Sequence, residues 1–209
     1  MIRVIAIDGP AAAGKGTLAR RLAAALGLAY LDTGLLYRAV GRRVLDAGGS
    51  PSDAVAAEAA ARALTPADLE RDDLRGPEAD RASSLVATVP AVRAALLDFQ
   101  RGVAQRGAVL DGRDIGTVVV PDAPMKLFVT ADLAARARRR WLELQDRGVA
   151  TPLLQVEAEL KARDMQDARR AAAPLAAAAD AVVLDTTALD ADAAFAMALQ
   201  FVRNRFGSA

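Results

Sequence analysis

Short apolar runs alternate with longer amphipathic stretches along most of the chain. The apolar runs predict buried strands at 3–8, 28–31, 108–111, 125–131 and 181–185. Leu18, Leu22 and Leu26 recur every four residues, which places them on one face of a helix predicted over 17–26 and ended by Gly27. Further amphipathic stretches predict helices over 34–47, 90–106, 132–147, 156–172 and 190–206. Strand and helix therefore alternate along most of the sequence.

This alternation predicts an α/β fold, a five-stranded parallel sheet with helices on both faces. The length of 209 residues fits a single domain, 1–209, with a sizeable core. The stretch 50–76 breaks the pattern, because it contains Ser-Pro, Thr-Pro and Gly-Pro pairs and enters the charged run LERDDLRGPEAD. We interpret this stretch as a surface insertion of irregular structure.

Composition removes several classes of chemistry. The 27 basic and 26 acidic residues give a net charge of +1, so the chain as a whole has no attraction for nucleic acid or anionic membranes. Without cysteine there is no disulfide, thiol catalysis or cysteine-bound zinc, and without histidine the usual neutral-pH general base is missing. A metal would need oxygen ligands, which favours Mg²⁺. No apolar run reaches the length of a membrane span and the start lacks a signal-peptide layout, so we expect a cytoplasmic protein.

The segment GPAAAGK at 9–15 matches the glycine, four-residue gap, Gly-Lys pattern of a phosphate-binding loop between a strand and a helix. Small residues allow backbone N–H groups to surround an anion, and the following helix presents its positive end. Lys15 is one of only three lysines and would supply a compact charge to the outer phosphates. The usual hydroxyl position holds Gly16, with Thr17 one residue later. The alternative is a flexible Gly-Ala turn.

Three separate segments bring arginines toward the expected ligand edge of the sheet. Arg38 follows the second predicted strand, Arg93 lies early in a helix, and Arg113 lies just past the carboxyl end of the strand at 108–111. Ligands of open α/β sheets bind beside the carboxyl ends of the strands. These arginines therefore indicate a second anionic ligand.

Several polar residues near these arginines allow two interpretations. Thr33 suits either that ligand or the N-cap of the following helix, and Ser84 suits either a ligand or an ordinary polar helix position. Asp111 could face Mg²⁺ through water or simply cap a strand end. Arg113 and Asp114 could bind the ligand or pair with each other on the surface.

Charged residues also recur at helical spacing in the last third of the chain. Arg136, Arg139 and Arg140 share one helix face, either as a solvated basic face or as a lid that closes on a phosphoryl group. Arg163, Asp167 and Arg170 also share a face, so three charged groups would point one way. They form either an intrahelical ion pair, in its less favourable order, or a stripe facing a ligand.

The chain resembles the bacterial cytidylate kinases, which are P-loop nucleoside monophosphate kinases. The resemblance lies in segments that follow one another in the family's order: GPAAAGKGT, LDTGLLYRA, PAVRAALL, DGRDIGTVV, and the RD, D and R positions within 163–170. The resemblance covers most of the chain, and DGRDIGTVV is its most specific part. It implies ATP-dependent phosphorylation of CMP and dCMP to CDP and dCDP with Mg²⁺. We expect a monomer without a nucleic-acid or membrane partner. The resemblance also implies a CMP-binding insertion over 33–106, here shortened because 64–76 is too short for the family's β-rich segment, and a lid over 136–170.

The resemblance also assigns roles residue by residue. ATP phosphates would be held by Gly9, Pro10, Ala11, Ala12, Ala13, Gly14, Lys15, Gly16 and Thr17. CMP would be bound at its phosphate by Thr33, Arg38 and Arg113, at cytosine by Ser84, Arg93 and Asp114, near the ribose by Asp167 with Arg163, and at the acceptor site by Arg170. The catalytic residues would be Lys15, Arg136, Arg139 and Arg163, and Mg²⁺ would be held by Thr17, directly or through water, and by Asp111 through water.

Other functions remain open on the residues alone. A kinase for UMP or AMP is the nearest alternative, although the arginine motif and longer lid of AMP kinases are not found. A P-loop NTPase that acts as a switch or associates with nucleic acid is the alternative from a different class. It would require a further hydrolysis motif or a clustered basic surface.

Overall fold

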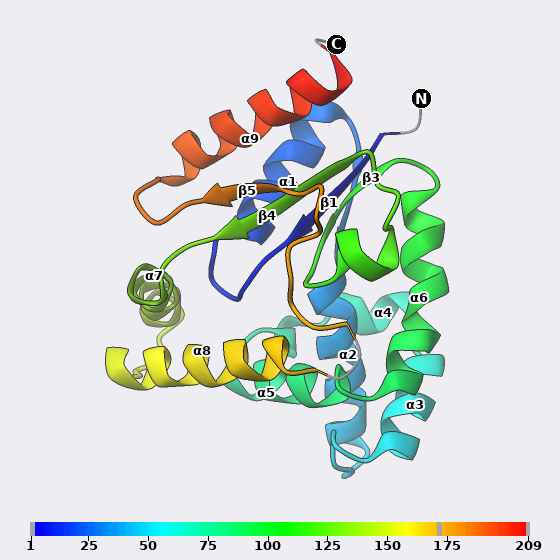
Figure 1. Cartoon of the computed structure of the whole chain (residues 1–209). Helices are drawn as coiled ribbons and strands as arrows, with labels where there is room; N and C mark the ends of the chain where they lie inside the picture. The colour runs from blue at the N-terminus through cyan, green and yellow to red at the C-terminus, as the bar shows by residue number, and fades with distance from the viewer. Residues whose placement is uncertain (1–2, 171–172, 208–209) are drawn as a thin grey trace. The chain divides into compact units, whose positions relative to one another are not determined.

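A five-stranded sheet forms the centre of the fold, and the computed structural model describes residues 3–170 and 173–207 (Figure 1). The strands are β1 (Val4–Asp8), β2 (Ala29–Asp32), β3 (Ala108–Asp111), β4 (Met125–Thr130) and β5 (Val182–Asp185). Their order is β2-β3-β1-β4-β5, and β1 pairs in parallel with β3 and β4, as does β4 with β5. The predicted parallel α/β fold is confirmed.

The chain divides into two compact units, 1–31 with 103–209 and 32–102. Helices of the first unit are α1 (Lys15–Leu26), α7 (Leu133–Asp146), α8 (Leu153–Ala168), α9 (Ala191–Phe206) and the π-helical turn η2 (Ile115–Val119). The second unit contains α2 (Thr33–Asp46), α3 (Ala54–Arg62), α4 (Pro66–Leu69), the 3₁₀ turn η1 (Asp72–Leu74), α5 (Pro77–Val86) and most of α6 (Pro90–Ala104). The predicted single domain with an insertion and a lid stays a prediction.

The core of the first unit explains why its strands are continuous apolar runs. Ile5 and Ile7 of β1, Leu127 of β4 and Leu184 of β5 pack with Leu22 of α1 in one buried cluster that also includes residues of α9. All three residues from Ile5 to Ile7 are fully buried. Side chains of neighbouring strand residues point to opposite faces, so both faces of β1 are covered.

The prediction of an irregular surface insertion at 50–76 is wrong. Residues 54–62 and 66–69 are α-helical, and α3 contributes Ala57 and Ala61 to a buried cluster with Leu36 of α2. Two of the three proline pairs that were taken as breakers start helices instead, since Pro66 occupies the first turn of α4 and Pro77 that of α5. Pro51 of the third pair lies in a turn, and α3 begins after Asp53, which accepts hydrogen bonds from the N–H groups of Val55 and Ala56.

Helix boundaries shift where the terminal residues have special conformations. The helix predicted from 17 begins at Lys15, because Gly14 adopts φ 87° as its N-cap. The helix predicted over 156–172 spans Leu153–Ala168, and its predicted end at 172 lies outside the described residues. Within the described part of the chain, no single helix is long and apolar enough to span a membrane, and α5 and α6 meet that test only as a pair bent by 98°.

Candidate active site

The loop between β1 and α1 has a conformation that depends on its small residues. Gly9 has φ 144°, and a Cβ there would lie 1.9 Å from the backbone oxygen of Val129 on β4. Ala12 also has a positive φ, of 60°, and Gly14 caps α1 without offering a side chain to its N–H groups. The N–H groups of the first turn of α1 are therefore oriented toward the loop, as in a helix N-terminus that binds an anion.

Lys15 is buried at the start of α1, with 5% of its surface exposed. Its Nζ donates a hydrogen bond of 2.8 Å to the Pro10 carbonyl, which holds the side chain over the loop. Burial lowers the pKa of Lys15 from its usual 10.5 to about 7, and the charges of Arg113 and Arg163 act in the same direction against the opposing effect of Asp111. The loop thus carries an amine whose neutral form is favoured by burial and whose charged form a bound phosphate would stabilise.

Two carboxylates border this loop. Asp8, at the end of β1, accepts hydrogen bonds from the backbone N–H groups of Ile115 and Gly116, and its burial raises its pKa to about 6. Asp111, at the end of β3, is 7% exposed and its Oδ2 lies 3.3 Å from where a Cβ on Gly16 would stand. A side chain at 16 would thus press on Asp111, which fits the glycine found there.

Asp167 gathers three other predicted substrate and catalytic residues around it, Arg113, Arg163 and Arg170. Asp167 is 1% exposed and receives a hydrogen bond of 3.1 Å from Nε of Arg113 as well as an ion pair from Arg170. Burial alone would raise the pKa of Asp167, but the charges of Arg113, Arg170 and Arg163 hold that pKa below its usual value. Because Arg113 comes from the turn after β3, the group is more than an intrahelical ion pair.

The helix-face arginines of α7 are not a solvated surface. Arg136 is 6% exposed, pairs with Asp164 of α8 at 2.7 Å and donates to the Ala11 carbonyl of the loop at 3.3 Å. Arg139 donates to Thr186, and Arg140 pairs with Glu143. The interpretation as a solvated basic face is therefore wrong.

Thr186 links one of these arginines to the loop. Its hydroxyl accepts a hydrogen bond of 3.0 Å from Arg139 and donates one of 3.1 Å to the Ala13 carbonyl. Together with the bond from Arg136 to the Ala11 carbonyl, this places two arginine side chains in contact with the loop backbone, one directly and one through Thr186. The arrangement brings Arg136 and Arg139, two of the three arginines on the predicted lid face, to the phosphate loop.

The second unit gathers other predicted substrate residues around Asp80. Nε and Nη2 of Arg38 donate to one carboxylate oxygen of Asp80 at 3.1 and 3.0 Å. The Ser84 hydroxyl donates to the Asp80 backbone carbonyl at 3.0 Å, and the Arg93 guanidinium lies 5.8 Å from the ring centre of Tyr37. Arg38 and Ser84 are thus brought together through Asp80.

The N-cap interpretation of Thr33 is wrong, because Asp32 has that role. The Asp32 side chain accepts a hydrogen bond of 3.1 Å from the N–H of Leu35, and Thr33 is the first residue of α2. Thr33 is 3% exposed. Its hydroxyl is therefore not needed to start the helix.

The residues suggested for Mg²⁺ offer oxygen ligands beside the loop. Thr17 is exposed in the first turn of α1, and Asp111 lies against the Gly16 backbone. No group of three acidic side chains within the described residues could hold a metal by itself. A single carboxylate with a hydroxyl suits Mg²⁺ that keeps most of its waters and is shared with phosphates.

The family model for cytidylate kinase matches residues 5–204. The chain belongs to the cytidylate kinase family. A cytidylate kinase of Granulibacter bethesdensis is 66% identical over 204 residues, which are 97% of this chain and 98% of that protein. A cytidylate kinase of Acidiphilium cryptum is 64% identical over 200 residues, or 95% and 94% of the two proteins. The crystal structure of TT1252 from Thermus thermophilus, 21% identical, matches with a TM-score of 0.52 over 99% of each chain and supports the fold alone.

In this member of the cytidylate kinase family, three polar residues of the candidate site escaped sequence reasoning: Asp8, Asp80 and Thr186. Asp8 had one signal, since it ends a buried strand directly before the loop. Asp80 lies four residues before Ser84 on one helix, which is a weak signal. Thr186 follows the last strand and carries no motif.

Proposed function

We propose that this protein transfers the γ-phosphoryl group of ATP to CMP and dCMP and so produces CDP and dCDP. The observation that carries the proposal is the buried Lys15 on the phosphate loop, whose pKa is lowered by burial and by the charges of Arg113 and Arg163, both of the cluster around Asp167. A cation on a donor loop next to a second cationic cluster suits two phosphorylated ligands that must react with each other.

The donor site would be the loop and the first turn of α1. Backbone N–H groups between Gly9 and Thr17, other than at Pro10, which has none, would surround the β- and γ-phosphates. Lys15 would move its charge from the Pro10 carbonyl to a phosphate oxygen. Thr17 and Asp111 would hold Mg²⁺, the latter through water. The metal would supply neutralisation of the charge that develops on the phosphates.

The acceptor site would use the predicted substrate residues. We propose contacts with the CMP phosphate from Thr33, Arg38 and Arg113, with cytosine from Ser84, Arg93 and Asp114, and with the ribose and acceptor side from Asp167, Arg163 and Arg170. A carboxylate such as Asp114 accepts a hydrogen bond from the cytosine amino group, whereas uracil presents a carbonyl there. An unpaired buried acceptor then penalises uracil.

The transfer needs no general base. A phosphate oxygen of CMP is already anionic near neutral pH and attacks the γ-phosphorus in line, so the protein supplies position and charge. Arg136 and Arg139 would stabilise the transferring group, since their contacts with Ala11 and, through Thr186, with Ala13 hold them at the loop.

A coupled assay of ADP release with ATP and Mg²⁺, offering CMP, dCMP, UMP and AMP in parallel, tests the proposal. We expect turnover with CMP and dCMP and little with UMP or AMP. Lys15→Ala should lower kcat by about 100-fold or more, the loss typical of removing one transition-state charge contact. Lys161→Ala, in an exposed lysine of α8, is the matched control and should keep full activity. Turnover with none of the four nucleotides, or full CMP turnover by Lys15→Ala, would contradict the proposal.

A further inference from the structure

The last residue of β1 forms a two-point contact with a distant segment. Both carboxylate oxygens of Asp8 accept backbone hydrogen bonds, one from Ile115 and one from Gly116, each 2.7 Å long. The partners are 107 and 108 residues away in the sequence. Both N–H groups lie in the first turn of η2, where a helix has no partner for them of its own. The carboxylate therefore caps η2 from another element.

A second bond anchors the same segment to β1 on its other side. The N–H of Gly112 donates to the Ile7 carbonyl at 2.9 Å. Residues 112–119, which we call the acceptor turn, are thus fixed to β1 before and after Arg113 and Asp114. These two residues lie between the two anchor points, so their backbone positions depend on both.

Packing leaves the acceptor turn little room to shift. A Cβ on Gly116 would lie 3.3 Å from Oδ2 of Asp8 and 3.1 Å from Cδ of Lys126. Asp8 itself is 4% exposed. A buried carboxylate is costly, and burial here outweighs the two N–H bonds and raises its pKa. The buried carboxylate of Asp8 therefore lowers stability. Proteins keep such a residue at functional sites, where the position of a group matters more than stability.

We propose that Asp8 is a positioning residue that holds the acceptor turn so that Arg113 and Asp114 face CMP. The assignment rests on the proposed function, since it takes Arg113 and Asp114 as CMP contacts. Asp8 itself touches neither nucleotide and acts through the backbone of residues 115 and 116. Its loss therefore weakens CMP binding more than ATP binding.

Asp8→Asn tests this directly, because the amide has one acceptor oxygen and turns an NH₂ group toward the other N–H. We expect the KM for CMP to rise about tenfold or more, as for one buried donor left unsatisfied, with the KM for ATP within about twofold. Amide hydrogen exchange at Ile115 and Gly116 should become faster, while exchange in β3 stays slow. Gly116→Ala should raise the KM for CMP in the same direction, because its Cβ pushes the turn away from an intact Asp8.

Asp190→Asn is the matched control. Asp190 also accepts two backbone hydrogen bonds, from Asp192 and Ala193, but at the start of α9, where asparagine caps equally well. Both KM values should stay unchanged in this control. If Asp8→Asn leaves the KM for CMP and the exchange at 115–116 unchanged, or raises both KM values equally, the assignment is wrong while the wild-type activity stands. A wild-type protein without CMP turnover would instead overturn the proposed function, and with it this assignment.

Discussion

Lys15 and Lys126 are both buried, and each donates to a backbone carbonyl five residues earlier in the chain, yet their surroundings differ. Lys126 has the carboxylate of Asp180 at 2.8 Å, which completes a structural ion pair. Lys15 faces the positive charges of Arg113 and Arg163. Burial, together with these two cations, favours the neutral form of Lys15 over the opposing effects of Asp111 and Asp8 until an anion arrives.

The titration of Lys15 predicts proton uptake when MgATP binds. Its pKa of about 7 lies below the usual 10.5, so at pH 8 most of the nucleotide-free protein holds a neutral Lys15. Phosphates raise that pKa, so binding at pH 8 should take up close to one proton, and binding at pH 6 should take up almost none from this lysine. Titration calorimetry in two buffers of different ionisation enthalpy measures the uptake. Equal apparent enthalpies at pH 8 would show that Lys15 is already charged.

The contact between Asp80 and Arg38 predicts that loss of the Asp80 side chain weakens binding of the acceptor nucleotide and not of ATP. Asp80 holds Arg38 through two N–H groups, and both side chains are about four-fifths buried, with exposures of 20% and 19%. Asp80→Ala should release Arg38 and raise the KM for CMP about tenfold, the size expected for one charge-assisted contact, without changing the KM for ATP. The Ser84 contact is kept, because it uses the Asp80 backbone.

Glu78→Ala is the control for this prediction. Glu78 lies on the same helix and pairs at 2.8 Å with Arg42, outside the predicted site, so both KM values should be unchanged. A lower KM for CMP in Asp80→Ala would mean that Asp80 competes with the phosphate for Arg38 rather than orienting it.

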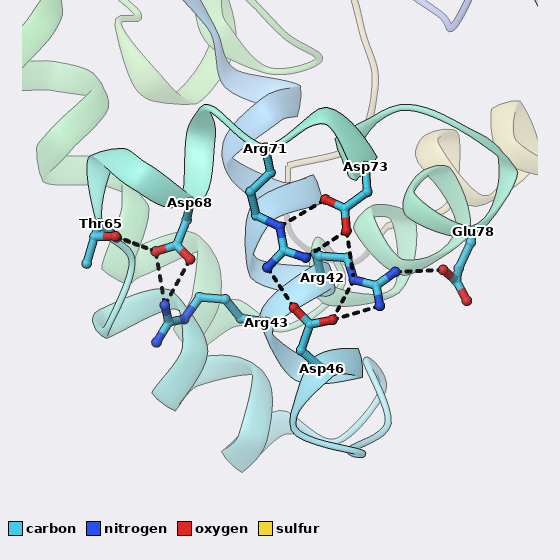
Figure 2. A network of polar contacts seen from close by, with 8 residues as sticks. All are labelled: Arg42, Arg43, Asp46, Thr65, Asp68, Arg71, Asp73 and Glu78. Carbon is cyan, nitrogen blue, oxygen red and sulfur yellow. Dashed lines mark hydrogen bonds and ion pairs between the residues drawn. The ribbon is translucent and has the colours of Figure 1, made fainter. Parts of the chain in front are cut away.

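At the scale of elements, the short helices of the second unit are connected by charge. Arg71 lies between Asp46 of α2 and Asp73 of η1, and Arg42 pairs with Asp46 and Glu78 (Figure 2). The ion pairs of Arg71 are 2.7 Å long to Asp46 and 2.6 Å long to Asp73. Single exposed ion pairs contribute little, but residues shared between pairs form a network with fixed geometry. This network joins α2, η1 and α5, and it adds to the apolar contact that η1 makes through the buried Leu74.

Asp68 is the position in this region where a single change should be measurable. Its carboxylate accepts hydrogen bonds from the hydroxyl and the N–H of Thr65 and pairs with Arg43. These contacts lower the pKa of Asp68 to about 2, and the hydrogen bond from the Thr65 hydroxyl has the largest effect. Asp68→Ala should lower the free energy of unfolding by about 1 to 2 kcal/mol at pH 7, the loss of a helix cap with a charged partner. Urea unfolding followed by circular dichroism measures it.

The pH dependence of this difference has a definite sign. A lowered pKa means that the contribution is complete above the usual value of 3.8 and is lost as the pH falls toward 2. The gap between wild type and Asp68→Ala should therefore narrow below pH 4. Asp72→Ala, in an exposed acid of η1, is the control and should stay close to wild type. A gap that persists at pH 2 would mean that the alanine acts through packing.

The elements that the sequence predicted well are those whose pattern is local. The strand at 108–111 was predicted residue for residue, and Asp132 was placed at the start of α7, because apolar runs and caps depend on a few neighbours. The stretch 50–76 failed for the opposite reason. Proline and aspartate can each interrupt a helix or begin one. Here they begin helices, as shown by the bonds of Asp53 to the N–H groups of Val55 and Ala56 and by the capping box of Thr65 with Asp68.

For the molecule as a whole, the same limit applies to the candidate site. Motifs indicated Lys15, Arg113 and Asp167, since each lies in a segment with a recognisable pattern. Asp8 had only its place at the end of a strand as a signal and Thr186 had none, because their partners are 107 and 173 residues away. Contacts over such separations depend on how the strands are ordered in the sheet, which a single sequence does not contain.

The charge balance of the whole molecule separates the proposed kinase from a nucleic-acid-associated NTPase. The net charge is +1, and arginines such as Arg42, Arg71 and Arg136 already have carboxylate partners in the structure. Nucleic-acid affinity depends on how many phosphates are neutralised by uncompensated basic groups.

We therefore expect no retention of single-stranded RNA in a filter-binding assay at about 0.15 M salt, and no stimulation of ADP release by RNA. Adding CMP to the same preparation should stimulate ADP release, which serves as the positive control for an intact protein. The decisive contrary result is RNA retention that weakens steeply as salt is raised. Such a salt slope would reveal a basic surface formed despite the near-zero net charge, and would favour the nucleic-acid alternative, because small nucleotides do not require one.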